Sequence, residues 1–299
     1  MNKYIIFIIL ASFIWGTSFP AIAIGLKYTS PELLLFLRFL IATVISFIVF
    51  PGTITRLKDK NLVVIGVFNG FAYLLQFIGQ KSVPAGQSSI LVNFYSVLVP
   101  IISLFILHEK PSKTIIGTVV IGFTGVVFLT GYSNSISTSY QNYLFGVIII
   151  FFSGVSWAFY VVFTKKFQLE KDKENKLTQK YSVQELFTAS MFYTALIAFI
   201  SLLFIKNPVS EIKIESIIVS SYLAIFATVI AFLLYLVGLE KLSATKVSII
   251  LLLEVVIAYI LSILFLGEII TVLQSIGSVF IVLSIVLVVK MTNKDELTN

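Results

Sequence analysis

Long apolar runs separated by short polar turns recur along the whole 299-residue chain. A run of about 18 or more apolar residues is long enough to cross the hydrocarbon core of a membrane as a helix. Reading these runs between turn signals and charges predicts about ten spans, at residues 4–26, 31–50, 61–80, 84–107, 113–131, 143–165, 183–205, 214–239, 243–266 and 270–290. The pattern therefore indicates an all-α integral membrane protein.

The composition supports this fold class and narrows the chemistry. The chain is 58% hydrophobic and 12% charged, and its mean hydropathy is +1.04. Cysteine is absent and His108 is the single histidine, which excludes disulfides and thiolate sites and removes most metal and histidine-based schemes. We therefore expect no enzyme activity, no metal and no cofactor. The expected partners are a small-molecule substrate and membrane lipid.

The basic residues fall mainly on one side of the predicted spans. When the N-terminus is placed in the cytoplasm, sixteen of the 21 Lys and Arg residues lie in cytoplasmic connections. The connections of the opposite side carry Lys27, Lys81, Lys206 and Lys213. The positive-inside rule then predicts a multi-pass protein of the cell (inner) membrane, with both termini and the charged linker 165–182 in the cytoplasm. The net charge of +7 fits this topology better than nucleic-acid binding.

The two halves of the chain resemble each other in sequence. The segment "IGQKSVPAGQSSIL" at 78–91 aligns with "VGLEKLSATKVSII" at 237–250, and the same register places Glu109 on Glu268. With about five spans in each half, the two copies would insert upside down relative to each other. That arrangement is an inverted-topology repeat, which serves alternating access around a site between the copies.

The repeat predicts the domain organisation. We expect a first five-helix repeat at residues 1–140 and an inverted second repeat at residues 141–299. The first span could be mistaken for a secretory signal peptide, because Ala21-Ile22-Ala23 resembles a cleavage site. Its Trp15 aligns with Trp157 of the second half, which favours a retained span.

Three stretches carry a family resemblance. "WGTSFPAIAIGLKYTSPELLLFLRFLIA", "VPIISLFILHEK" and "LLLEVVIAYILSILFLGEIITVLQSIGSVFIVLSIVLV" resemble the drug/metabolite transporter superfamily, EamA type, and the resemblance covers nearly the entire chain. It implies a ten-helix exporter of amino acids or other small metabolites with a central cavity between the halves. The family often has a proline after the glutamate, but this chain has Glu254-Val255. The resemblance therefore does not decide whether the ninth span is kinked.

Polar side chains recur at helical spacing inside the spans, where lipid cannot satisfy them. The third span carries Asn69, Tyr73 and Gln76 on one face. The candidate substrate-binding set is completed by Trp15, Asn93, Trp157, Tyr160 and Tyr235 on other spans. Such residues either line a cavity, which would suit an apolar or aromatic substrate group, or hold helices together by hydrogen bonds.

Two charged residues lie inside predicted spans and belong to the candidate set. Arg38 is a structural charge tied to helix ends or backbone carbonyls, an anion contact for a substrate carboxylate, or a snorkelling side chain, and we favour the first. Glu254 lies about 11 residues into the ninth helix, close to the middle of the membrane. It either exchanges a proton or binds an ammonium group, or it pairs with a tyrosine or the backbone.

These features together predict a secondary transporter that exports amino acids or similar small metabolites by alternating access, as a monomer or weak dimer. A sugar-phosphate or nucleotide-sugar exchanger would need several converging Lys or Arg residues. An intramembrane enzyme would need a clustered nucleophile, acid–base or metal set. The inverted repeat is weak evidence against a channel.

Overall fold

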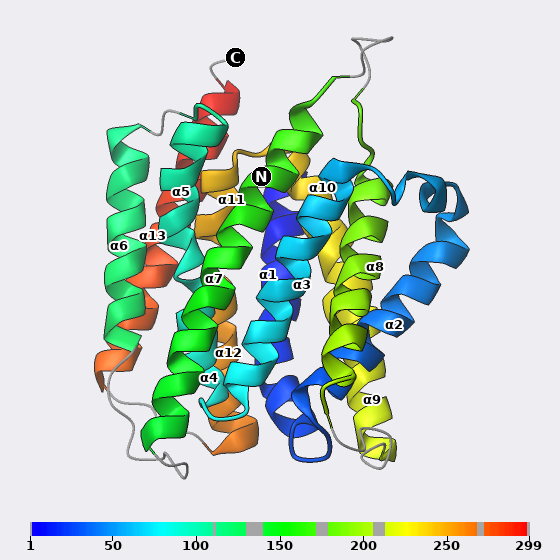
Figure 1. The fold of residues 1–299 in the computed structure, drawn as a ribbon. Helices are drawn as coiled ribbons and strands as arrows, with labels where there is room; N and C mark the ends of the chain where they lie inside the picture. Colours follow the sequence, from blue (N-terminus) through cyan, green and yellow to red (C-terminus); the bar gives the residue numbers. More distant parts are fainter. Residues whose placement is uncertain are drawn as a thin grey trace.

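The computed structural model describes residues 2–109, 112–129, 140–171, 179–205, 213–267 and 272–297. Within these ranges the regular structure is helical, and the β-structure is a single bridge between Lys171 and Gln179. Figure 1 shows long helices that run side by side along one axis. Glu268 and linker residues 172–178, on which two of the predictions fall, lie outside the described residues.

The helices follow one another closely along the chain. They are α1 (Lys3–Gly25), α2 (Pro31–Val49), η1 (Pro51–Arg56), α3 (Lys60–Gln80), α4 (Ala85–Asn93), α5 (Tyr95–Ile106), α6 (Lys113–Leu129), α7 (Tyr140–Leu169), α8 (Val183–Leu202), α9 (Ile214–Tyr222), η3 (Leu223–Ile230), α10 (Ala231–Lys241), α11 (Ala244–Ile250), α12 (Leu253–Leu266) and α13 (Val272–Leu297).

Eight helical stretches of the described chain are long and apolar enough to cross a membrane. They are Lys3–Gly25, Pro31–Val49, Lys60–Gln80, Ala85–Ile106, Gln141–Leu169, Val183–Leu202, Ile214–Lys241 and Ala244–Leu266. Each coincides with a predicted span to within a few residues. The other two predicted spans fall on α6 and α13, whose apolar parts, Lys113–Gly125 and Ser275–Ser284, are shorter. The prediction of an all-helical, multi-pass membrane protein is confirmed.

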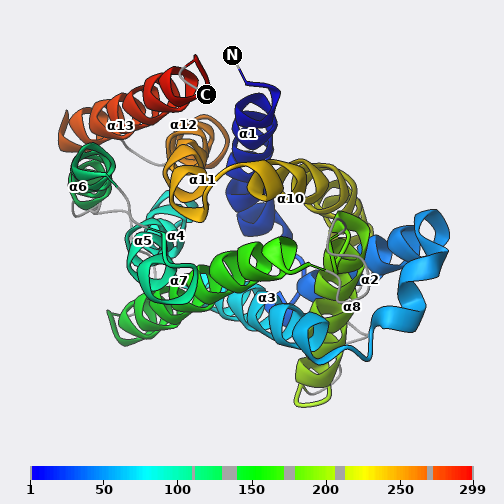
Figure 2. The same cartoon turned by 90° about the horizontal axis from the view of Figure 1, so that it is seen from above.

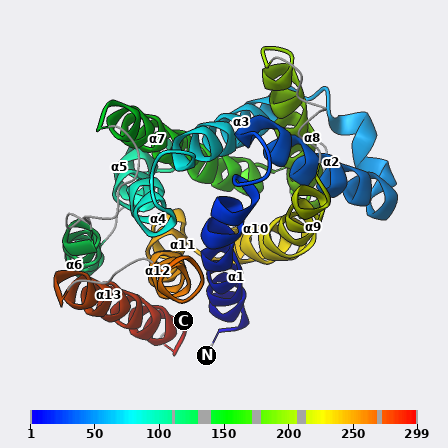
Figure 3. The same cartoon turned by 90° about the horizontal axis from the view of Figure 1, so that it is seen from below.

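Apolar side chains also cover the outside of the bundle. Ile48, Phe105 and Leu264 are 73%, 72% and 70% exposed, as expected for a surface that faces lipid. Seen along the bundle axis, α6 and α13 pair at one edge and α2 and α8 lie at the opposite edge (Figures 2 and 3). The helices between them enclose the centre of the molecule.

Two of the spans are each built from two consecutive helices. α4 ends at Asn93 and α5 begins at Tyr95, while α11 ends at Ile250 and α12 begins at Leu253. The ninth span is therefore interrupted even though no proline follows Glu254. The span from α9 to α10 passes through η3, a π-helical segment, and such segments often mark functional sites.

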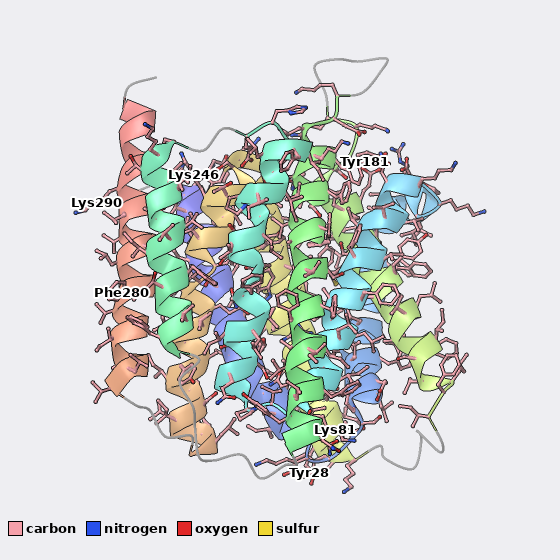
Figure 4. All side chains as sticks on the ribbon, turned by 60° about the vertical axis from the view of Figure 1, so that its left-hand side comes forward. Tyr28, Lys81, Tyr181, Lys246, Phe280 and Lys290 are labelled. Carbon is pink, nitrogen blue, oxygen red and sulfur yellow. The ribbon has the colours of Figure 1, made fainter. Side chains whose placement is uncertain are left out.

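The two ends of the bundle carry different parts of the chain. Tyr181 and Lys246 lie at the upper end and Tyr28 and Lys81 at the lower end, and Lys290 of α13 lies toward the upper end (Figure 4). The N-terminus and the C-terminus are near each other when the bundle is viewed from above (Figure 2). The structure thus separates these residues into the same two groups as the distribution of Lys and Arg along the sequence.

Candidate functional site

A small cavity lies in the middle of the bundle. Its lining residues are Trp15, Ser18, Tyr73, Gln76, Val92, Tyr95, Trp157 and Glu254. Trp15 is about 12 residues into α1, or roughly 18 Å along the helix, so the cavity is near the centre of the span. The cavity volume of about 20 Å³ holds about one water molecule. In this conformation the cavity is therefore too small for a ligand of the size of an amino acid.

The indole of Trp157, on α7, is the centre of an aromatic cluster beside the cavity. Its ring centroid lies 5.9 Å from Trp15, 5.3 Å from Tyr73, 6.2 Å from Tyr95 and 5.2 Å from Tyr160. The rings are tilted or edge-on to one another, which are favourable geometries for aromatic pairs. The cluster draws α1, α3, α5 and α7 together around one point.

Glu254 brings a carboxyl group to the cavity from the first turn of α12. Its side chain lines the cavity while the residue is only 7% exposed, and its backbone N–H donates to the Leu251 carbonyl at 2.9 Å. Asn93, whose Nδ2 donates to the Ser89 carbonyl at 2.9 Å, is a polar neighbour of this carboxyl group. The ion pairs within the described residues join Arg56 to Glu185, Lys180 to Glu170 and Lys241 to Glu240. Glu254 takes part in none of them.

Arg38 is fully buried, but it lies behind the cavity rather than in its lining. Its Nε donates to Thr228 Oγ1 at 2.7 Å and its Nη2 to the Ala227 carbonyl at 3.4 Å, both in η3. The guanidinium lies 4.7 Å from the centroid of the Tyr73 ring, which itself lines the cavity. These contacts match the structural alternative, a charge tied to backbone carbonyls of a neighbouring helix.

Trp15 is held by the same η3 segment. Its indole N–H donates to the Ala227 carbonyl at 2.7 Å. Close packing fixes the neighbouring face of α1, because a Cβ built on Gly16 would lie 2.5 Å from Ile257 Cβ and 2.9 Å from the Glu254 carbonyl oxygen. Only glycine permits this approach, which sets Trp15 and Glu254 on adjacent helices of one site.

The structure divides the predicted site residues into two groups. Trp15, Tyr73, Gln76, Trp157 and Glu254 line the cavity, whereas Arg38, Asn69, Asn93, Tyr160 and Tyr235 lie outside its lining.

Residues of the second group make contacts between helices. Asn69 Nδ2 donates to Thr194 Oγ1 at 2.7 Å and so joins α3 to α8. The Tyr160 hydroxyl lies 3.2 Å from Ser190 Oγ, and the Tyr235 ring lies 5.2 Å from Trp15. For Asn69 this is the helix-joining alternative rather than the cavity-lining one.

Sequence reasoning missed Ser18, Val92 and Tyr95. Tyr95 lies at the start of α5, directly after the turn at Phe94, and lines the cavity. The internal repeat did contain a signal for Tyr95, because the register that aligns 78–91 with 237–250 also places Tyr95 on Glu254.

Comparison with known proteins agrees with this architecture. The model of the EamA-like transporter family matches the chain in two segments, residues 2–131 and 144–290. An uncharacterized transporter of Archaeoglobus fulgidus is 26% identical over 295 residues, which are 97% of this chain and 99% of that protein. The uncharacterized transporter YdfC of Bacillus subtilis is 25% identical over 271 residues, which cover 89% of this chain and 84% of that protein.

A solved structure, described as a crystal structure of a protein, has the same fold. It aligns with a TM-score of 0.78 and 16% sequence identity, and the alignment covers 99% of both chains. The family match extends over most of the sequence, as two consecutive segments. The chain therefore belongs to the EamA-like transporter family, within the drug/metabolite transporter superfamily.

Proposed function

We propose that the protein is a secondary transporter that exports amino acids or similar small metabolites across the cell membrane by alternating access. The observation that carries this proposal is the mid-span cavity, to which both halves of the chain contribute. Trp15 and Tyr73 come from the first half, and Trp157 and Glu254 from the second. A site of this kind, between two halves and near the bilayer midplane, is typical of transporters.

We further propose that the fold is a pair of inverted five-helix repeats, ten helices in all. Support comes from the two interrupted spans, α4–α5 and α11–α12, because the sequence repeat places their interruptions within two residues of each other. The turn residues at both places keep right-handed helical dihedrals, so the two spans share a local irregularity of the helix and not an unwound segment.

A second argument for the repeat comes from paired contacts between helices. The register that places Tyr95 on Glu254 also places Asn69 on Thr228. Asn69 joins α3 to α8 through Thr194, and Thr228 joins η3 to α2 through Arg38. Asn69 of the first half thus contacts α8, the second span of the second half. Thr228, the aligned residue of the second half, contacts α2, the second span of the first half.

Alternating access requires contacts that open and close at each end of the cavity. At the upper end, Lys165 Nζ donates to the Leu239 carbonyl at 2.8 Å, and the Glu109 carboxylate accepts from the Ala244 N–H at 3.0 Å. Toward the lower end, Gln80 Nε2 donates to the Phe19 carbonyl at 2.7 Å. We propose that these contacts break in turn. The upper end faces the cytoplasm in this proposal, as the Lys and Arg distribution predicts.

Uptake by proteoliposomes tests the proposed function. Purified protein is reconstituted, and uptake of labelled amino acids and amines is measured with and without an imposed pH gradient. Glu254→Gln should abolish uptake or its response to the gradient, because it removes the titratable group and keeps the shape of the side chain. Glu215→Gln, at an exposed position in α9, is the matched control and should retain uptake. Equal uptake by protein-free liposomes for every compound would contradict the proposal.

A further inference from the structure

The residues that line the cavity determine which charge on a bound molecule is favoured. Of the described residues that line it, Glu254 is the one with a charged side chain, and four others are Trp or Tyr. We propose that the cavity selects small organic cations with an aromatic or apolar body, and that it disfavours zwitterions and carboxylates. This inference rests on the proposed transport function and, among the small metabolites named there, places amines before the zwitterionic amino acids.

A substrate carboxylate would lack a cation among the lining residues. Arg38, the nearest candidate, already donates to Thr228 and Ala227 and lies against Tyr73. Its Nη1 has no hydrogen-bond partner, but the side chain is fully buried and outside the cavity lining. An anion brought into the cavity would therefore meet the neutral groups of Ser18 and Gln76 but no cation among the described lining residues, and the Glu254 carboxylate would repel it.

An ammonium group, in contrast, would meet two favourable features together. Glu254 takes part in no ion pair within the described residues, so its carboxylate is available as a counter-ion. The rings of Trp15, Tyr73, Tyr95 and Trp157 border the same small volume. Aromatic side chains attract cations through the ring faces, and cages of such rings recognise alkylated ammonium groups.

The same rings favour a substrate with an apolar body. Val92 and the four aromatic residues supply most of the lining, while Ser18 and Gln76 supply neutral polar groups. Binding must separate the helices, because the present volume of about 20 Å³ holds about one water molecule. A substrate whose ring replaces contacts within the aromatic cluster would offset part of the cost of that separation.

Intrinsic fluorescence provides a direct reporter. The chain has two tryptophans, and both Trp15 and Trp157 line the cavity. Three probes share a phenyl ring and differ in charge: 2-phenylethylamine, L-phenylalanine and 3-phenylpropionate. Titration of purified protein should give saturable fluorescence changes with 2-phenylethylamine at concentrations roughly tenfold or more below those needed for L-phenylalanine. 3-Phenylpropionate should give the weakest response.

Two substitutions assign the effect to the carboxylate. Glu254→Gln should abolish the response to 2-phenylethylamine, whereas Glu215→Gln should preserve it. Glu254→Asp keeps the charge and should retain part of the affinity, which controls for a folding defect in the Gln variant. Melting temperatures are recorded for all three proteins.

The outcomes separate this inference from the transport proposal. Preferential binding of L-phenylalanine or 3-phenylpropionate, an unchanged titration of Glu254→Gln, or no fluorescence change with 2-phenylethylamine would overturn the cation inference. Uptake of the zwitterion in preference to the amine would leave the transport proposal standing. Glu254-dependent binding of the amine without uptake of any compound would instead support the inference and count against transport.

Discussion

Trp15 and Arg38 donate hydrogen bonds to the same acceptor, the carbonyl oxygen of Ala227, at 2.7 and 3.4 Å. One of these residues lines the cavity and the other lies behind it. The π-helical segment η3 thus connects a buried charge of α2 with the aromatic wall on α1. Arg38 therefore contacts both η3 and Tyr73, a residue of the cavity lining.

Loss of Arg38 should destabilise the protein. Arg38→Ala removes the donors to Thr228 and Ala227 and leaves a buried space, and we expect a loss of about 3 kcal/mol in the free energy of unfolding. Arg56→Ala, at a surface position, should cost about 0.5 kcal/mol or less. Thermal unfolding in detergent measures both. A stable Arg38→Ala protein that no longer binds substrate would show that the arginine is a ligand contact.

The close approach of α1 and α12 gives a second prediction. Gly16→Ala places a methyl group against Ile257 and the Glu254 carbonyl and should cost about 1 to 3 kcal/mol of stability. It should also weaken substrate binding, because it moves Glu254 away from Trp15. Gly117→Ala is the matched control, since a Cβ there has no heavy atom within 4 Å. Equal melting temperatures for the two variants would contradict the packing argument.

Membrane orientation can be measured with single cysteines, because the sequence has none of its own. Lys58 and Lys81 are exposed near the start of α3 and just after its end, respectively. An impermeant thiol reagent added to intact cells should label Lys81→Cys and should label Lys58→Cys only after the cells are opened. The reverse pattern would invert the proposed topology.

The sequence was sufficient to predict the helical spans, because each depends on the local density of apolar residues. Eight of them appear as membrane-length helices at the predicted places. The break in the ninth span was less accessible to sequence reasoning. Leu251 and Leu252 interrupt the helix without a proline or glycine, so neither of these sequence signals marks the break.

The candidate site was predictable in chemistry but only partly in geometry. Trp15 and Trp157 were identified from the repeat, and they meet at the cavity. Asn69 shares a helix face with Tyr73 and Gln76 but lies one turn nearer the start of α3, where its side chain contacts α8. A helical period gives the face of a helix, whereas which neighbour covers each turn depends on packing.

Alternating access to the mid-span cavity is the central claim, and accessibility of Ser18 tests it most directly. Ser18→Cys, in the cavity lining, is treated with an impermeant anionic thiosulfonate in right-side-out and in inside-out vesicles. Ser153→Cys is the control, because Ser153 is fully buried between α7 and α3 and donates to the Ala72 carbonyl. The account predicts that Ser18→Cys reacts from either side, that bound 2-phenylethylamine slows both reactions, and that Ser153→Cys stays unreactive. Reaction from one side only, or passage of the reagent through the protein into the vesicle lumen, would contradict it.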